Sequence, residues 1–322
     1  MTSVSEPYPG PGEVRIHIHS IGLNYAEVLS RKGLYSWAPK LPYIPGMEAY
    51  GEIEVLGEGV KNRKVGEKVI VGTQYGTYAE KIVVQEARAL PALRFYSAEE
   101  NSAFAVNFMT AWVALFEMAR LQPSDSVLIH AAAGGVGTAA VQLAKHFGCA
   151  VYGTASSDRK LQLLSELNVD GAINYLRQDF EEELNSQTDG RGVDIILETV
   201  GGEIFRKSLK VLRPFGTIVV AGFASYNLKK WNPISWIKTW QDMPRTNLSH
   251  MARNSYGFMA FHLGYLLPYV RLMNQVWERL TTFIYANNIH PVIGHTFEFE
   301  DMSKAHELME SRDSMGKIVV NV

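Results

Sequence analysis

The sequence contains a single cysteine, Cys149, among its 322 residues. A disulfide within the chain is therefore impossible, and a zinc site built from several cysteines is excluded. No run of about 18 apolar residues occurs, so no segment is expected to span a membrane as a helix. The N-terminus has neither a basic start nor an apolar stretch, and we do not expect a secretory signal peptide there. These absences predict a cytoplasmic protein.

The charge of the chain is nearly balanced. Lys and Arg number 31 and Asp and Glu number 33, which gives a formal net charge of -2. Because neither half of the chain is strongly basic, we expect no nucleic-acid partner. Hydrophobic residues make up 47% and charged residues 20%, the usual mix of a globular protein. A chain of this length favours two domains that need neither a disulfide nor a metal to stay folded.

Short strand patterns occupy residues 14–85. The segment VRIHIHSI (14–21) alternates apolar and polar residues, as a half-buried strand does. Similar pieces follow between residues 50 and 85, separated by glycines, which indicates a compact β-rich domain. The pattern then changes: residues 97–121 predict a helix, opened by Ser97 and Glu100 as a capping box.

From residue 126 onwards, strand patterns alternate with helix patterns. Apolar runs at 126–130, 149–155, 172–175, 193–200 and 216–223 are separated by helical segments, one of which has Asp158 as its expected N-cap. Strands that alternate with helices form a parallel, doubly wound sheet, so the fold class is α/β. The last segment, 291–322, predicts a strand, a helix and a strand that return to the first domain.

A glycine-rich turn gives the strongest functional signal. An apolar strand ends at His130, and Ala132, Gly134 and Gly137 follow in the spacing A-x-G-x-x-G before a helix. Glycines let the backbone approach a pyrophosphate, and the helix N-terminus supplies free N–H groups. We therefore expect Gly134, Gly135 and Val136 to bind a dinucleotide. A tight strand–helix turn without a ligand is the alternative.

The second strand of this pattern indicates which dinucleotide binds. NAD-binding proteins carry an acid near the end of that strand, where it holds the ribose 2′-hydroxyl. Here the strand ends GTASS (153–157), without an acid. Thr154, Ser157 and Lys160 are expected to contact the cofactor, and the hydroxyl and basic side chains of this segment fit a 2′-phosphate. NADP(H) is thus favoured, although a basic pair at a helix start is also typical of a solvated surface.

The chain resembles the medium-chain dehydrogenases/reductases of the zinc-free quinone oxidoreductase branch, and within it the vesicle amine transport protein-like group. The matching segments follow the family order over nearly the whole chain: GLNYAEVLSRKGLY (22–35), PGMEAYGEI (45–53), VGEKVIV (65–71), NFMTAW (107–112), AAAGGVG (131–137), AINY (172–175), GFMAFHLGYLL (257–267) and GKIVV (316–320). The resemblance implies a Rossmann sheet inserted in a GroES-like catalytic domain. We expect that catalytic domain at 1–107, the NADP-binding domain at 108–288 and the return at 289–322.

The zinc ligands of related alcohol dehydrogenases are missing. Asn24 and Met47 stand where those enzymes have Cys and His, and neither is a usual zinc ligand. Without a Lewis acid a plain ketone is poorly activated, whereas a quinone or a conjugated enone accepts hydride with hydrogen-bond help alone. The sequence therefore predicts a reductase that works without zinc.

The resemblance implies further site residues. It places Asn24 and Tyr35 beside the nicotinamide, where Asn24 orients the carboxamide or a substrate carbonyl and Tyr35 donates a hydrogen bond or a proton. The alternatives are that Asn24 caps a turn and that Tyr35 only packs its ring. Tyr175 is implied near the adenosine phosphate. The residues expected around the nicotinamide are Thr110, Gly222, Phe261 and Leu263.

Three functions fit these features. The first is an NADPH-dependent reductase of quinones or α,β-unsaturated carbonyls, the second a trans-acting enoyl reductase of carrier-bound acyl chains, and the third a cofactor-binding protein with little turnover. A homodimer is expected, because the strand around residues 259–263 should be an exposed sheet edge that a second copy can pair with. The tryptophans of WNPISWIKTW (231–240) share no helical face, which favours packing or a mobile lid over membrane contact.

Overall fold

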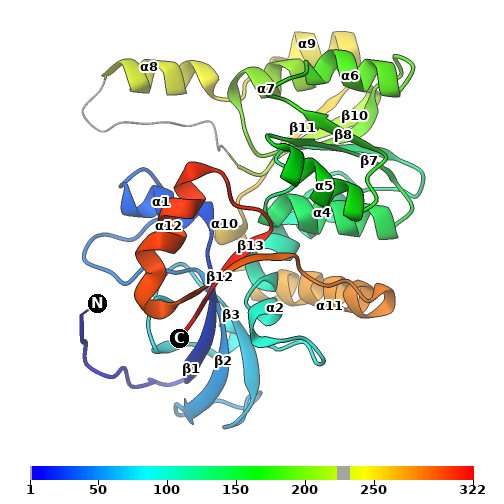
Figure 1. Cartoon of the computed structure of the whole chain (residues 1–322). Helices are drawn as coiled ribbons and strands as arrows, with labels where there is room; N and C mark the ends of the chain where they lie inside the picture. The colour runs from blue at the N-terminus through cyan, green and yellow to red at the C-terminus, as the bar shows by residue number, and fades with distance from the viewer. Residues whose placement is uncertain (1, 223–232) are drawn as a thin grey trace. The chain divides into compact units, whose positions relative to one another are not determined.

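The structure is a computed structural model that describes residues 2–222 and 233–322 (Figure 1). The chain divides into two compact units, one of residues 1–109 and 263–322 and the other of residues 110–262. The second unit is therefore an insertion between two parts of the first.

The first unit is rich in strands. Its elements before the insertion are β1 (Glu13–Gly22), α1 (Tyr25–Arg31), β2 (Glu48–Leu56), β3 (Lys68–Gly72), β4 (Lys81–Gln85), a 3₁₀ turn (Glu86–Arg88), β5 (Ala89–Pro91), α2 (Ala98–Asn101) and a π-helical turn (Phe104–Phe108). Those after it are α10 (Leu263–Leu266), α11 (Val270–Asn287), β12 (Ile293–Glu298), a 3₁₀ turn (Phe299–Asp301), α12 (Met302–Ser311) and β13 (Lys317–Asn321).

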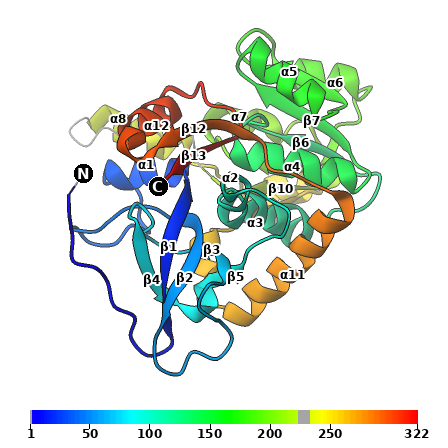
Figure 2. The same ribbon diagram turned by 60° about the horizontal axis from the view of Figure 1, so that its bottom comes forward.

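One seven-stranded sheet organises this unit, in the order β12-β13-β1-β2-β3-β5, with β4 also paired to β1. Figure 2 shows β4 and β2 on either side of β1. The alternation that predicts β1 matches its burial, since Val14, Ile16 and Ile18 are buried on the core side. The C-terminal strand β13 pairs with the end of β1, so the last residues of the chain complete the sheet that the first residues begin.

The second unit alternates strands and helices. Its elements are a π-helical turn (Val113–Met118), β6 (Ser126–Ile129), α4 (Gly135–His146), β7 (Ala150–Ala155), α5 (Asp158–Glu166), β8 (Gly171–Asn174), α6 (Phe180–Gln187), β9 (Val193–Glu198), α7 (Gly202–Ser208), β10 (Leu212–Val220), α8 (Pro233–Asp242), α9 (Leu248–Asn254) and β11 (Gly257–Ala260). The short helix α3 (Met109–Trp112) contains the boundary between the units.

The six strands of the second unit form a parallel sheet in the order β11-β10-β9-β6-β7-β8. Read from β8, this is the order 3-2-1-4-5-6 of a doubly wound Rossmann sheet. Its central strands β6 and β9 are buried runs, and α4 packs on β6 and β7 while α5 packs on β7 and β8. The α/β fold class is confirmed. In such a sheet, ligands bind at the carboxyl ends of the strands, where the order reverses between β6 and β9.

Two local expectations are corrected. Asp158 is not the N-cap of α5: Ser157 caps the helix by accepting from the Lys160 N–H, and Asp158 is the first helical residue, paired with Arg177 at 2.8 Å. The helix expected over 97–121 is interrupted by the two π-helical turns, although its capping box is present, since Ser97 and Glu100 each accept the other's N–H.

The observed units divide the chain at residues 109/110 and 262/263, whereas the sequence interpretation divides it at 107/108 and 288/289. The difference concerns α10 and α11. Tyr285 of α11 accepts the Arg94 N–H at 2.8 Å and packs its ring against Tyr96, and the Tyr96 hydroxyl donates to the Ile289 carbonyl. These contacts tie α11 to the first unit.

The tryptophan-rich segment lies only partly within the described residues, and Trp231 is outside them. Its described part belongs to α8 (Pro233–Asp242), and Trp240 lies in the last turn of that helix. The Trp240 ring is exposed, and the guanidinium of Arg245 lies 3.9 Å from its centroid. Among the residues that the structure describes, no helix is both long and apolar enough to cross a membrane.

Candidate functional site

The turn between β6 and α4 forms an anion-binding cradle. Gly134 is the N-cap of α4, and the N–H groups of Gly135 and Val136 begin the helix, where no intrahelical acceptor exists. A Cβ atom on Gly137 would lie 2.4 Å from the carbonyl oxygen of Ala131, so only glycine fits there. The close turn aims the positive end of the helix dipole at the carboxyl edge of the sheet, which suits a pyrophosphate.

Hydroxyl and basic side chains gather at the carboxyl ends of β7 and β8. Lys160 Nζ lies 3.4 Å from Ser156 Oγ, and Ser157 caps α5. Arg177, which follows β8, pairs with Asp158 of α5, and Tyr175 beside it is 39% exposed. Within the described segment 150–160, which contains β7 and the start of α5, Asp158 is the only acid, and Arg177 pairs with it. The hydroxyl and basic side chains of this segment therefore suit a phosphate.

The side chain of Thr154 is buried in the interior of the second unit. Its hydroxyl lies 3.1 Å from His130 Nδ1, and His130 Nε2 lies 2.8 Å from Ser208 Oγ. Ser208 donates to the Ile204 carbonyl, so its oxygen accepts from His130 Nε2–H and Thr154 donates to Nδ1. Burial lowers the pKa of His130 to about 3, and the imidazole is neutral at pH 7. The side chain of Thr154 therefore stabilises the strand end, and its backbone carbonyl accepts the Ala132 N–H of the glycine-rich turn.

The carboxyl ends of β9, β10 and β11 form a second part of this edge. Gly222 follows β10, and a Cβ atom there would lie 3.4 Å from the backbone oxygen of Thr199. Phe261, after β11, donates its N–H to the Val220 carbonyl at 3.3 Å. At the end of β9, Glu198 accepts the Val200 and Gly201 N–H groups, and burial raises its pKa to about 7. Thr110, the first residue of this unit, is buried in α3.

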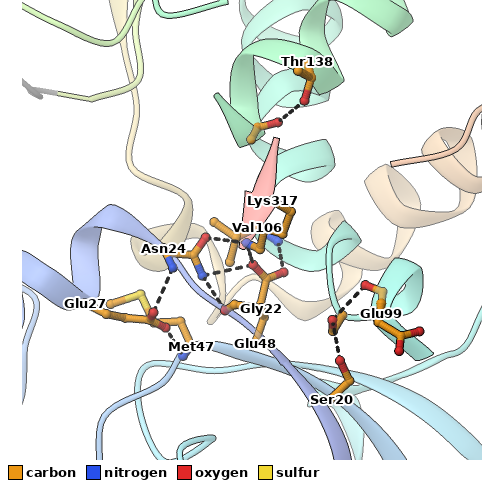
Figure 3. A network of polar contacts seen from close by, with 12 residues as sticks. Ser20, Gly22, Asn24, Glu27, Met47, Glu48, Glu99, Val106, Thr138 and Lys317 are labelled. Carbon is orange, nitrogen blue, oxygen red and sulfur yellow. Dashed lines mark hydrogen bonds and ion pairs between the residues drawn. The ribbon is translucent and has the colours of Figure 1, made fainter. Parts of the chain in front are cut away.

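In the first unit, Asn24 belongs to a buried polar network (Figure 3). Its Nδ2 donates to Glu48 Oε1 at 3.0 Å and to the Gly22 carbonyl at 3.3 Å, and its Oδ1 accepts from Lys317 Nζ at 2.9 Å. Lys317 also forms an ion pair with Glu48, whose other oxygen accepts the Val106 N–H at 2.9 Å. Both charged residues are buried, so each requires the other.

A second buried carboxylate lies next to Asn24. Glu27 of α1 accepts the Asn24 N–H at 2.8 Å, the Met47 N–H at 2.7 Å and the Tyr78 hydroxyl at 2.6 Å. Burial raises the pKa of Glu27 to about 7, against the lowering effect of these donors and of Lys317. Tyr78 also contacts His306 Nε2 at 2.9 Å, and burial, with the charge of Arg31, lowers the pKa of His306 to about 4.

Tyr35 belongs to an aromatic cluster in the same unit. Its ring meets Trp37 edge to face at 6.4 Å between centroids, and Trp37 meets Tyr265 of α10 in the same way. Gly264 lets Trp37 lie against α10, since a Cβ atom there would meet the indole at 2.6 Å. Leu263 begins this helix. Burial, then the nearby Tyr265 and Glu27, raises the pKa of Tyr35 well above its usual value, so the phenol stays protonated.

The donor set of the network around Asn24 does not fit zinc. Asn24 and Met47 offer no usual ligand, and the ammonium of Lys317 occupies the space beside Asn24 Oδ1 and Glu48 Oε1. Across residues 2–222 and 233–322, no three His, Cys, Asp or Glu side chains are grouped so that they could hold a metal ion.

A Rossmann sheet inserted into a β-rich unit of this topology defines a medium-chain dehydrogenase/reductase. Family models agree: residues 10–94 match the alcohol dehydrogenase GroES-like domain, and residues 135–255 match the zinc-binding dehydrogenase domain. The chain belongs to the medium-chain dehydrogenase/reductase superfamily, close to VAT-1 homologues and quinone oxidoreductase-like proteins. The family resemblance predicted from the sequence is confirmed.

Among its relatives is the synaptic vesicle membrane protein VAT-1 homolog of Mus musculus, which is 35% identical over 98% of this chain and 77% of that protein. The quinone oxidoreductase of Thermus thermophilus, solved also in complex with NADPH, is 30% identical, with a TM-score of 0.82 over 100% of this chain and 95% of the other. The JamJ enoyl reductase is 25% identical, with a TM-score of 0.84 over 99% and 94% of the two chains.

Several polar residues of the site were not expected from the sequence. Lys317 stands at the start of an apolar run, GKIVV, where a strand residue beside a sheet core is rarely charged. A lysine in this position indicates a buried acidic partner, which in the structure is Glu48. Glu27, Tyr78 and His306 come from distant parts of the chain, and nothing in their spacing indicates that they meet.

Proposed function

We propose that this protein is an NADPH-dependent reductase that transfers hydride to a quinone or an α,β-unsaturated carbonyl without zinc. The observation that carries the proposal is the cradle at the start of α4, together with the acid-free end of β7. There the N–H groups of Gly135 and Val136 fit a pyrophosphate, and Ser157 and Lys160 fit a 2′-phosphate. NADPH, when bound, supplies the hydride.

The remaining site residues have proposed roles in this reaction. Tyr175 lies at the β8 end, on the side of Ser157 and Lys160, and binds near the adenosine phosphate. Gly222 and Phe261, at the ends of β10 and β11, together with Thr110 and Leu263, bind the nicotinamide portion. Thr154 supports the glycine-rich turn through its backbone carbonyl. Asn24 and Tyr35 act at the reacting end of the cofactor, as the family resemblance implies.

Tyr35 is the proposed hydrogen-bond donor to the acceptor oxygen. Hydride addition places negative charge on that oxygen, and a donor that strengthens its hydrogen bond as the charge develops lowers the barrier. Burial raises the pKa of Tyr35, which keeps its proton in place at neutral pH and makes it a donor of a hydrogen bond rather than a strong acid. The final proton then comes from water.

Steady-state oxidation of NADPH with a simple benzoquinone and with an aliphatic enone tests this function. We expect turnover of both acceptors with NADPH and a higher KM with NADH. Turnover without any difference between the two cofactors would refute the NADPH assignment. Binding of NADPH without turnover of either acceptor would refute the reductase and favour a cofactor-binding protein.

A second function, enoyl reduction on a carrier-bound acyl chain, is favoured by the similarity to the JamJ enoyl reductase over nearly the whole of both chains. The two functions use the same hydride transfer and differ in the acceptor. A crotonyl thioester of pantetheine separates them, because a quinone reductase reduces it far more slowly than a benzoquinone, whereas an enoyl reductase prefers it.

A further inference from the structure

The amide of Asn24 is surrounded by groups that can each play only one hydrogen-bonding role. The Lys317 ammonium only donates, whereas the Glu48 carboxylate and the Gly22 carbonyl only accept. Lys317 Nζ lies 2.9 Å from Oδ1, and Glu48 Oε1 lies 3.0 Å from Nδ2. Turning the amide over would place a donor against the ammonium and an acceptor against the carboxylate. The orientation of Asn24 is therefore fixed by the chemistry of its neighbours (Figure 3).

This orientation decides what Asn24 can offer to a ligand. Its two amide hydrogens point to Glu48 and to the Gly22 carbonyl, so its donor capacity is used within the protein. Its oxygen has two lone pairs, one of which accepts from Lys317 Nζ. Asn24 is also the N-cap of α1, where its side chain faces the Glu27 N–H in a capping-box arrangement. That N–H donates to the Asn24 backbone carbonyl at 3.0 Å, and the side chain itself makes no cap hydrogen bond. Asn24 as a whole residue is 7% exposed. What remains is one acceptor position, which suits an N–H donor and not a carbonyl oxygen.

The two residues that hold the amide belong to hydrogen-bonded strands. Lys317 begins β13, its own N–H donates to the Val292 carbonyl, and the strand pairs with β12 and β1. Glu48 begins β2, and the Val106 N–H holds its second oxygen. A buried ion pair adds little net stability, because desolvation offsets the attraction, and an apolar pair of similar volume often serves as well. The buried Lys317–Glu48 pair is therefore better explained by its hydrogen bonds to the Asn24 amide, which fix the amide's orientation, than by a contribution to stability.

We propose that Lys317 and Glu48 are positioning residues that hold Asn24 as a hydrogen-bond acceptor for an N–H group of the ligand. This inference rests on the proposed function, in which the ligand group of that chemistry is the carboxamide of the nicotinamide ring. Of the two roles expected for Asn24, it selects the cofactor carboxamide and excludes a hydrogen bond donated to the substrate carbonyl.

Three cofactors that differ only in the carboxamide provide the test. NADPH and its thionicotinamide analogue keep the N–H₂ group, whereas the 3-acetylpyridine analogue lacks it. The double variant Glu48→Gln/Lys317→Met removes both charges, so that no unpaired charge is left buried. The single variant Lys317→Arg keeps a cationic donor to Asn24 Oδ1, so it should bind all three cofactors as the wild type does. Ser20→Ala is the matched control. Ser20 lies on β1, as Gly22 does, and its hydroxyl forms a buried hydrogen bond with Ser102 that does not involve the Asn24 amide.

We expect the double variant to bind NADPH and the thionicotinamide analogue about tenfold more weakly, the loss of one hydrogen bond. Its affinity for the 3-acetylpyridine analogue should stay within about twofold of the wild type, since that ligand never makes the bond. An equal loss for all three cofactors would show that the pair only supports the fold. Unchanged affinity for NADPH would also overturn the proposal.

A measurement without cofactor separates this inference from the proposed function. In protein labelled with ¹⁵N-asparagine, the Asn24 amide hydrogens should exchange slowly with water in the wild type and in Ser20→Ala. In the double variant, exchange should be at least tenfold faster, because the glutamine at position 48 does not fix the amide. Unchanged exchange would refute the positioning role. Failure of the wild type to bind any of the three cofactors would refute the proposed function instead.

Discussion

Gly22 and Lys317 approach so closely that no side chain fits between them. A Cβ atom on Gly22 would lie 2.7 Å from Lys317 Cε and 2.1 Å from the backbone oxygen of Ser102. Because Ser102 contributes backbone, the strain cannot be relieved by a rotamer change alone. We expect Gly22→Ala to lower the free energy of unfolding by about 1–3 kcal/mol, as overpacking of a core does. Urea denaturation followed by fluorescence measures it.

Gly72→Ala is the matched control for this prediction. Gly72 lies in β3, directly opposite Glu48 in the register with β2, and a Cβ atom there would meet only Ala105 at 3.8 Å. Its effect should be below about 1 kcal/mol, since the contact is an ordinary one. Equal losses for the two alanines would show that the approach of Gly22 to Lys317 is not the source of the strain.

Ser157→Asp should reverse the cofactor preference. Aspartate caps a helix as well as serine does, so α5 should keep its stability. The new carboxylate would stand at the end of β7, where it repels a 2′-phosphate and suits a ribose 2′-hydroxyl. We expect the dissociation constant of NADPH to rise at least about tenfold, while that of NADH stays equal or falls. Fluorescence titration with both cofactors decides it, and a parallel loss of both would contradict the assignment of this edge to the 2′-phosphate.

Much of the fold follows from patterns that are local in the sequence. The alternation in β1, the apolar runs of β6 and β9 and the spacing of Gly134 and Gly137 each reflect a backbone requirement that neighbouring residues satisfy. The Ser97–Glu100 capping box is similarly local. The assignment of α11 to the first unit does not follow from local patterns. The Tyr285–Arg94 contact joins residues about 190 positions apart. A helical pattern also does not reveal on which unit the buried face of the helix packs.

The candidate site divides in the same way. The glycine-rich turn could be predicted, since its ligand-binding groups are backbone N–H groups of consecutive residues. The Asn24 network could not, because Lys317 reaches Asn24 and Glu48 across 293 and 269 positions of the chain. The N-cap of α5 is Ser157, one residue before the predicted Asp158. Serine and aspartate are both good N-cap residues, so the sequence alone does not choose between them.

A homodimer is expected through the edge of the Rossmann sheet. Among residues 2–222 and 233–322, β11 (Gly257–Ala260) is the outermost strand of the sheet and pairs only with β10, which leaves one side of its backbone without a strand partner there. Pairing with a second copy would satisfy those groups. Light scattering at micromolar concentration should give twice the chain mass of 36.0 kDa. Met259→Lys places a charge on this edge and should favour the monomer, and a monomeric wild type would contradict the prediction.

Glu27 should make the stability of the protein depend on pH. Its carboxyl pKa is raised from 4.5 to about 7 by burial, so the folded state holds a proton that the unfolded state releases. Below about pH 4.5 both states are protonated and the stabilising effect is complete, and it is lost as pH rises through about 7. A shift of this size corresponds to roughly 3 kcal/mol.

Comparison with Glu27→Gln isolates this effect, because the other titrating groups are shared. We expect the free energy of unfolding of the wild type, relative to the variant, to fall between pH 4.5 and pH 7.5. Urea denaturation at several pH values measures it. A difference that rises with pH would mean that the donors Asn24, Met47 and Tyr78 outweigh burial and keep Glu27 ionised.

The last prediction concerns Tyr35, whose ring packs on Trp37 and whose hydroxyl stays protonated. If it donates a hydrogen bond to the acceptor oxygen, Tyr35→Phe removes one donor to a developing negative charge. Such a loss costs about 2.7–4 kcal/mol, or roughly a hundred- to thousandfold in rate. Phenylalanine keeps the packing against Trp37, so NADPH affinity and thermal stability should not change.

The size of the effect should depend on the acceptor. An enone develops charge on a single oxygen and needs the donor, whereas a quinone accepts hydride easily and spreads the charge over its ring, so kcat with a quinone should fall less. Parallel assays of Tyr35→Phe with both acceptors measure the difference, and Trp37→Phe controls for packing in the same cluster. If kcat for the enone stays within about twofold of wild type, a change below roughly 0.5 kcal/mol, Tyr35 only shapes the cluster with Trp37 and Tyr265. The charge on the acceptor oxygen would then be stabilised by water.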